Sequence, residues 1–107
     1  ISLRLVLPAI KSLLCEKEPE LLLLVKPQFE VGRERVGKGG VVRDGNAHKD
    51  ALKGVINCSY KEGWKPQGLL ASPITGPAGN HEYLLWLGTA GTDALPDLDE
   101  LVQKTLS

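Results

Sequence analysis

The feature that most constrains the fold is a run of five apolar residues, Leu21 to Val25, followed at once by Lys26 and Pro27. The run shows no polar alternation, which predicts a strand buried on both faces of a sheet, and the prolines at 19 and 27 favour a strand over a short helix. Pro27 ends the strand because proline donates no ladder hydrogen bond. Ligands of open α/β sheets sit beyond the carboxyl ends of parallel strands, so Lys26 marks a candidate site.

Length and composition fit one globular domain. The chain has 107 residues, no net charge, 42% apolar residues and 24% charged residues. Net neutrality argues against binding nucleic acid by overall charge, although a local basic patch remains compatible with it. No apolar run approaches the roughly 20 residues that span a bilayer, and no signal-peptide pattern is present, so we expect a cytoplasmic protein without a membrane partner. The sequence contains no methionine and begins within an apolar run, which suggests a piece of a longer protein.

The two cysteines, Cys15 and Cys58, each fall inside a predicted helix. They form no C-x-x-C pair and have no histidine at ligand spacing, so we expect reduced, buried thiols and no metal site.

Periodicity divides the chain into helices and strands. Apolar residues recur at helical spacing over residues 2–14, 46–62 and 96–106, with Pro8 either starting or kinking the first helix. Strands are predicted over residues 21–25, 67–74 and 81–87, with a turn over 75–80 and a long glycine-containing loop over 28–43. Asp44 is suited to cap the second helix, whose apolar stripe includes Tyr60, and Gly63 to end it in a left-handed conformation.

The order of these elements predicts the topology. Strand, helix, strand favours a parallel crossover, and two strands joined by a short turn favour an antiparallel hairpin. The expected fold is therefore α/β: about three strands, the last antiparallel to the others, with flanking helices. An exposed outer edge of the first strand would allow a homodimer.

This topology gives Lys26 a candidate partner. If the last strand lies beside the first, Glu82 at its start approaches Lys26, and the two form an acid/base pair. The alternative is that Lys26 only marks where a buried strand surfaces, and that Glu82 makes a surface ion pair worth about 0–1 kcal/mol.

The loop after the first strand is the most basic part of the chain. Its segment GRERVGKG, residues 32–39, nearly matches the phosphate-binding loop pattern but has Gly39 where that pattern needs a hydroxyl for magnesium. We expect a mobile loop whose Arg33, Arg35, Lys38 and Arg43 suit an RNA backbone, or else an ordinary solvated loop. His48 and His81 lack sequence partners and are interpreted as structural, and Trp64, Tyr83 and Trp86 as core or rim residues.

Three segments, taken in order, resemble one family. ISLRLVLPAI, LVKPQFEVGRERVGKGGVVRD and SPITGPAGNHEYLLWL closely resemble the hemolysin A (TlyA) family, FtsJ-like ribosomal RNA 2′-O-methyltransferases that use S-adenosylmethionine. The resemblance covers Ile1 to about Leu87 and only the second half of the methyltransferase domain. It implies a partial Rossmann-like domain over residues 1–90 and a helical extension over residues 91–107.

The resemblance also implies roles for two residues. FtsJ-like enzymes use a lysine–aspartate–lysine–glutamate tetrad; Lys26 matches the second lysine and Glu82 the glutamate. Lys26 would be the base or would stabilise the oxyanion, and a base role requires its pKa to fall from the ordinary value of about 10.4. The first lysine, the aspartate and the cofactor loop have no counterpart here, so no cofactor-binding residue is identified. Methyl transfer is implied for a parent protein, and inactivity for this chain alone.

The sequence is compatible with two other functions. One is a non-catalytic module that binds RNA through the basic loop. The other is the haemolysis that the family name suggests, which requires membrane-spanning elements and is disfavoured by the short apolar runs.

Overall fold

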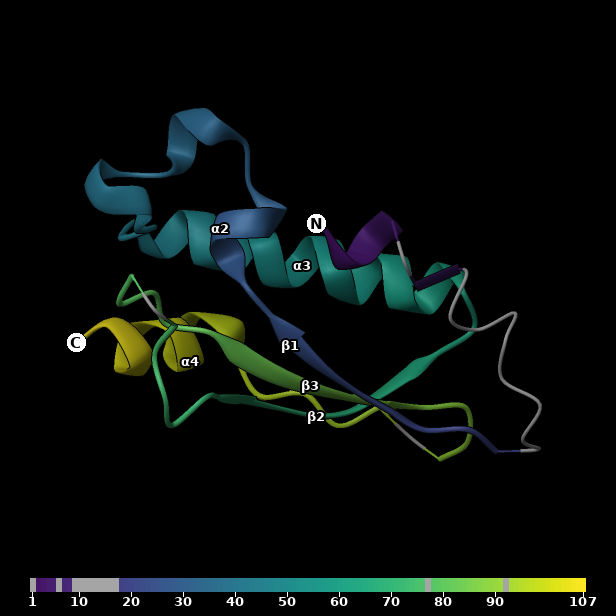
Figure 1. The fold of residues 1–107 in the computed structure, drawn as a ribbon. Coiled ribbons are helices and arrows are strands. Elements are labelled where there is room, and N and C mark those ends of the chain that lie inside the picture. The colour runs from purple at the N-terminus through teal and green to yellow at the C-terminus, as the bar shows by residue number, and fades with distance from the viewer. Residues whose placement is uncertain (1, 6, 9–17, 77, 92) are drawn as a thin grey trace.

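The computed structural model describes residues 2–5, 7–8, 18–76, 78–91 and 93–107. The strands and helices labelled in Figure 1 are β1 (Leu21–Val25), α2 (Pro27–Glu30), α3 (Gly45–Lys61), β2 (Lys65–Ala71), β3 (Tyr83–Gly88) and α4 (Leu98–Leu106). Two short 3-10 turns, Arg33–Arg35 and Lys38–Gly40, lie between α2 and α3. Residues 3–5, 7 and 8 are also helical, and the rest of the predicted first helix, with Cys15, lies outside the described residues.

The sheet has the order β1-β3-β2, and β3 is antiparallel to both neighbours. The predicted α/β class and the antiparallel last strand are confirmed. β1 and β2 run parallel to each other with β3 between them, so β1 is an edge strand among the described residues.

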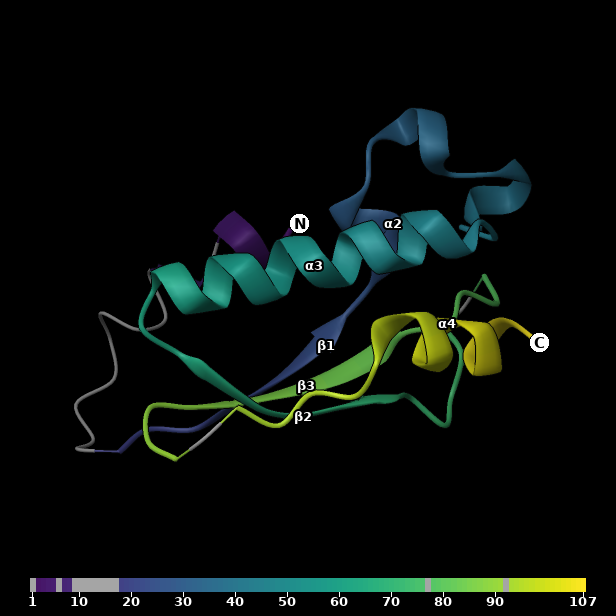
Figure 2. The same ribbon diagram turned by 180° about the vertical axis from the view of Figure 1, so that it is seen from behind.

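One face of the sheet holds the core. The helix α3 lies along this face, and α4 packs against α3 and β2 (Figures 1 and 2). The core residues come from every one of these elements and from Trp64 just before β2: Leu23, Val25, Leu52, Val55, Trp64, Leu69, Tyr83, Leu85, Leu87 and Val102. The terminal helix α4 is therefore part of the same core as the sheet.

The opposite face of the sheet is apolar and exposed. Leu22 is 67% exposed, Leu70 53% and Trp86 46%. The prediction that β1 is buried on both faces is wrong, because the described helices cover only one face. Leu22 and Trp86 are register partners, so they share the uncovered face.

The helix α3 follows its sequence signals closely. The Asp44 side chain accepts a hydrogen bond from the Asn46 amide, and Gly63 has a φ of 82°, so both predicted ends are confirmed. Tyr60 was predicted to join the apolar stripe, but it is 43% exposed and its hydroxyl donates to Asp93 at 2.7 Å.

Other boundaries differ from the sequence analysis. The predicted loop over residues 28–43 contains α2 and the two 3-10 turns, because Pro27 is a favourable first helical residue. The strand β2 begins at Lys65 and passes through Pro66 at a register shift, which an edge strand tolerates. The cap of α4 is Asp97, whose side chain accepts from the Glu100 amide.

Cys58 is a free thiol and is half-buried rather than buried; its Sγ lies 3.8 Å from the Arg4 carbonyl oxygen. Within the described ranges, no group of three or more His, Cys, Asp or Glu residues is arranged to hold a metal ion. Among the same residues, no helix has the length and apolar character needed to cross a membrane.

Candidate functional site

Strand pairing determines which residues meet at the site. Val25, the last residue of β1, faces Tyr83, the first residue of β3. Lys26 follows Val25 and Glu82 precedes Tyr83, so both lie at the same end of the sheet. The printed pairing ends at Val25 and Tyr83, so Lys26 and Glu82 are the first residues beyond the ladder on their two strands.

Lys26 lies between β1 and α2 and is half-buried. Its Nζ lies 5.6 Å from the centre of the Phe29 ring, within the range of a cation–π contact. A small cavity of about 210 Å³ is lined by Leu3, Leu24, Lys26, Phe29 and Glu30. In the part of the chain that the structure describes, no ion pair joins Lys26 to Glu82. Lys26 and Glu82 thus lie at the same end of the sheet, but their charged groups contact different described residues: Phe29 for Lys26 and Gln28 for Glu82.

Glu82 is only 5% exposed, which is unusual for a carboxylate. Its Oε2 accepts a hydrogen bond from Gln28 Nε2 at 3.2 Å. The same oxygen lies against Gly76, where an added Cβ would come within 2.6 Å of it. The close approach needs a residue without a side chain, so Gly76 forms one wall of the Glu82 site.

Gln28 is a site residue that the sequence analysis missed. It lies on α2, and its Nε2 holds Glu82 while its Oε1 is buried without a hydrogen-bond partner among the described residues. A buried acceptor without a partner is energetically costly, so this oxygen is an unusual feature of the region around Glu82. In the sequence, the one feature that could have indicated Gln28 as a site residue is its position two residues after Lys26.

Glu30, the last residue of α2, is a buried carboxylate with several partners. Its side chain is 1% exposed; Oε1 accepts from the Ser2 hydroxyl at 2.6 Å, and Oε2 accepts from the Leu3 amide at 2.9 Å. Arg4 Nε lies 3.5 Å from the same carboxylate. Glu30 thus anchors the N-terminal helical segment to α2, next to Lys26.

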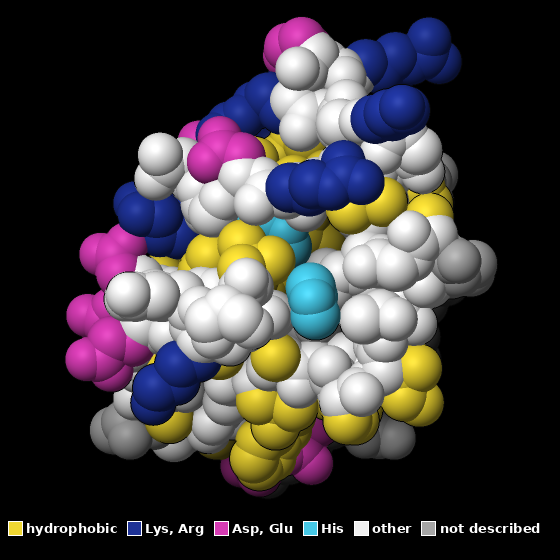
Figure 3. Space-filling view, turned by 90° about the vertical axis from the view of Figure 1, so that its left-hand side faces the viewer, with side chains coloured by type: hydrophobic (Ala, Val, Ile, Leu, Met, Phe, Trp, Pro, Cys, Tyr) yellow, Lys and Arg dark blue, Asp and Glu magenta, His cyan; other side chains and the backbone are white. Residues whose placement is uncertain are grey.

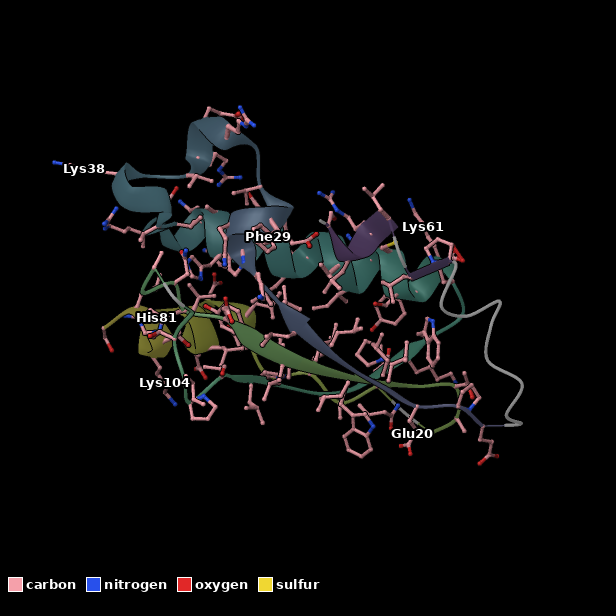
Figure 4. All side chains as sticks on the ribbon, viewed as in Figure 1. Glu20, Phe29, Lys38, Lys61, His81 and Lys104 are labelled. Carbon is pink, nitrogen blue, oxygen red and sulfur yellow. The ribbon has the colours of Figure 1, made fainter. Side chains whose placement is uncertain are left out.

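The four basic residues of the loop differ in their surroundings. Arg35 is committed to α3, with Nη1 2.7 Å from Asp50 Oδ2, and this contact lowers the pKa of the Asp50 carboxyl. Arg43 Nη1 donates to the Lys38 carbonyl at 3.1 Å. Arg33 and Lys38 are exposed, and Lys38 extends away from the body of the protein (Figure 4). Lys and Arg side chains gather on the upper part of the face shown in Figure 3.

Backbone hydrogen bonds close the loop on itself and tie it to the segment before β3. The Gly37 amide donates to the Val41 carbonyl at 2.8 Å, and the Val42 amide donates to the Asn80 side chain at 2.9 Å.

The two histidines differ in burial. His48 is fully buried between the Val42 carbonyl, 2.8 Å from Nε2, and the Tyr83 hydroxyl, 2.9 Å from Nδ1, which bears out a structural role. His81 is half-buried beside the turn (Figure 4). Burial lowers the pKa of His48, and burial raises the pKa of Tyr83. Both groups are therefore held in their neutral forms.

Comparisons with known proteins agree with this fold. The FtsJ-like methyltransferase family model matches residues 1–89. The chain is 41% identical over 109 residues to the 16S/23S rRNA (cytidine-2′-O)-methyltransferase TlyA of Mycobacterium tuberculosis, covering 100% of this chain and 40% of TlyA. It is 53% identical over 91 residues to YqxC of Bacillus subtilis, a protein described as an rRNA methyltransferase, covering 85% of this chain and 32% of YqxC.

A solved structure of a relative has a similar fold. The chain superposes on a protein of Lactococcus lactis described as a hemolysin with a TM-score of 0.86 and 39% identity, covering 97% of this chain and 50% of that one. The chain spans less than half the length of the curated relatives it matches. The resemblance to the hemolysin A (TlyA) family is confirmed, and the chain belongs to the FtsJ-like methyltransferase family.

Proposed function

We propose that this chain supplies the acceptor side of the active site in an S-adenosylmethionine-dependent ribosomal RNA ribose 2′-O-methyltransferase. The observation that supports this most strongly is the pairing of Val25 with Tyr83, which brings Lys26 and Glu82 to one end of the sheet. The relative TlyA acts on cytidine 2′-oxygens of rRNA by its name, and we extend ribose methylation to this chain.

In the proposed reaction, Lys26 and Glu82 act on the ribose hydroxyl. A 2′-oxygen becomes a better nucleophile as it loses its proton, and a nearby cation stabilises the developing negative charge. Lys26 supplies that cation, or accepts the proton when its amine is neutral. Glu82, held by Gln28, orients Lys26 or accepts a hydrogen bond from the sugar.

The cavity beside Lys26 does not suit the cofactor. S-adenosylmethionine presents a methyl group on a positively charged sulfur. The cavity at Lys26 is about 210 Å³, below the roughly 300–1,000 Å³ of typical ligand sites, and its cation would repel that sulfur. We therefore propose that this chain alone does not bind the cofactor and is inactive in isolation.

The RNA partner is proposed to contact Arg33, Lys38 and Arg43, which are exposed. Arg35 is a weaker candidate because its guanidinium is already paired with Asp50. Contacts to phosphates position an RNA without reading its sequence, which suits a loop next to a ribose site.

A chimera tests the proposal. The segment of TlyA that aligns with this chain is replaced by residues 1–107, and mass spectrometry measures 2′-O-methylcytidine in ribosomal RNA incubated with S-adenosylmethionine. We expect methylation by the folded chimera and none by the 107-residue chain alone. A folded chimera that binds the cofactor but transfers no methyl group would contradict the assignment.

A second candidate is a non-catalytic RNA-binding module. The exposed Arg33 and Lys38 side chains, which form no ion pair with another described residue, favour it. Filter binding of RNA to the chain at increasing salt concentrations distinguishes the two readings of the loop, because each phosphate contact steepens the salt dependence. Binding by the chain together with an inactive chimera would favour the module.

We also propose that the exposed sheet face supports a homodimer. A shallow apolar groove of about 440 Å³ runs over Leu22, Gly68, Leu69, Leu70, Leu84 and Trp86. The edge of β1 beside it carries unpaired backbone groups among the described residues. Edges and apolar patches of this kind are covered when copies associate.

A further inference from the structure

Two side chains outside the basic loop form hydrogen bonds with the backbone of its residue Val42. The Val42 amide donates to Asn80 Oδ1 at 2.9 Å, and the Val42 carbonyl lies 2.8 Å from His48 Nε2. The Val42 side chain is 1% exposed. Both backbone polar groups of one loop residue are thus satisfied by buried side chains.

Asn80 makes a second contact with the same loop. Its Nδ2 donates to the Gly40 carbonyl at 2.8 Å, and the residue is 3% exposed. An amide can only donate and a carbonyl can only accept, so these two partners fix which end of the Asn80 side chain is the oxygen. Asn80 therefore bridges two loop positions that are two residues apart.

The partners of His48 fix its tautomer in the same way. The Val42 carbonyl can only accept, so Nε2 carries the hydrogen, and Nδ1 accepts from the Tyr83 hydroxyl at 2.9 Å. The His48 and Tyr83 rings also meet edge to face, with centres 5.7 Å apart. His48 links the loop to the first residue of β3.

Asn80 and His48 also contact residues that lie next to Glu82. The Asn80 carbonyl accepts from the Gly76 amide at 2.8 Å, and Gly76 is the residue against which the Glu82 carboxylate packs. Tyr83, the partner of His48, follows Glu82 directly. A displacement of the loop would have to break contacts within this same small region.

Residues 37–43 of the loop are held together by hydrogen bonds among themselves. Hydrogen bonds join Gly37 to Val41 at 2.8 Å, Gly40 to Gly37 at 3.1 Å, and the Arg43 side chain to the Lys38 carbonyl at 3.1 Å. Lys38 and Arg43 thus have fixed positions on the backbone that Asn80 holds.

We propose that Asn80 and His48 are positioning residues that hold the basic loop in register with Glu82, so that an RNA backbone bound by Lys38 and Arg43 presents its ribose to Lys26 and Glu82. The inference rests on the proposed function and adds a role for two residues that do not touch the reacting atoms. It also explains why buried polar side chains are placed between a surface loop and a strand end.

The test uses the 107-residue chain, a short cytidine-rich RNA oligonucleotide and three variants. Asn80→Ala removes both contacts, Asn80→Asp keeps the acceptor for Val42 but loses the donor to Gly40, and Asn57→Ala changes an exposed residue of α3 as the control. NMR follows two quantities: hydrogen exchange of the Val42 amide, and the RNA-induced shifts of the loop and of the Glu82 segment.

In the wild type and in Asn57→Ala, we expect a protected Val42 amide and RNA-induced shifts in both regions. In Asn80→Ala, Val42 should exchange at least tenfold faster, and RNA should still bind within about threefold while shifting only the loop. Asn80→Asp should restore the Val42 protection. If Asn80 only stabilised the fold, its loss would not remove the RNA-induced shift of the Glu82 segment while leaving RNA affinity nearly unchanged.

Two results would overturn the inference, and they differ. The first is an Asn80→Ala variant in which the Val42 amide stays protected and RNA shifts the signals of both regions as in the wild type. The Asn80 hydrogen bonds would then not be what positions the loop. If the wild type shows a protected Val42 but no RNA-induced shift, the loop does not bind RNA, and the RNA contacts of the proposed function fail with it.

Discussion

Val25 and Tyr83 face each other across the ladder between β1 and β3, and this pairing places Lys26 and Glu82 at the same end of the sheet. A shift of the register by one residue would turn one of the two side chains to the opposite face. The candidate site therefore depends on strand register, which the buried partners Leu23 and Leu85 help to fix.

The stability of the fold should depend on pH through His48. Burial is the main cause that lowers its pKa below the ordinary value of 6.5, with the nearby His81 acting in the same direction and the Val42 and Asp44 contacts opposing it. The unfolded chain then binds a proton more readily than the folded one, so stability is full above pH 6.5 and falls as the pH drops below it.

Urea unfolding between about pH 5.5 and 7.5 measures this effect. His48→Gln should flatten the dependence, whereas His81→Gln, which changes a half-buried histidine, should largely keep it. An equal slope in the wild type and in His48→Gln would show that another group is responsible.

Gly76→Ala should destabilise the protein and disturb Glu82. The added methyl group would lie 2.6 Å from the Glu82 carboxylate, so the carboxylate or the turn must move, at a cost of about 1–3 kcal/mol. Chemical denaturation gives the change in the free energy of unfolding.

Gly54→Ala is the matched control. Gly54 lies inside α3, and an added methyl group there meets Arg4 only at 3.6 Å, so this variant should gain up to about 1 kcal/mol from helix propensity. If the two variants were equally stable, Gly76 would not be a wall of the Glu82 site.

The apolar sheet face should govern self-association. We expect light scattering to give twice the monomer mass of 11.6 kDa at high protein concentration, and Leu22→Lys to restore the monomer, because a lysine on the uncovered face opposes burial of that face.

Leu5→Lys is the control, since Leu5 is 72% exposed, as apolar as Leu22, and lies on the N-terminal helical segment. A wild type that stays monomeric at high concentration would refute the dimer, and equal effects of both variants would place the contact elsewhere.

Local signals predicted the local structure well. Asp44 and Gly63 mark the ends of α3 through their own side chain and backbone, and a short turn between two strands requires an antiparallel pair. The same topology predicts that Lys26 and Glu82 lie at one end of the sheet, and the strand pairing places both there.

Non-local contacts were not predictable in the same way. The exposure of Leu22 depends on which face the helices cover, and an apolar run does not encode that choice. Asn80 had no signal beyond its place in a turn, because its partners Gly40 and Val42 lie about forty residues away in the sequence. Gln28 was hidden inside a segment predicted to be a loop.

The most direct test of the central claim is methyl transfer by the TlyA chimera carrying Lys26→Ala or Glu82→Gln. With Lys26→Ala, we expect the turnover of ribosomal RNA to fall by about a hundredfold or more, the size of a lost acid/base or oxyanion contact. Glu82→Gln should lower it less, and the affinities for RNA and cofactor should stay within about threefold of the unsubstituted chimera. A Lys26→Ala chimera that methylates at the unsubstituted rate would contradict the account.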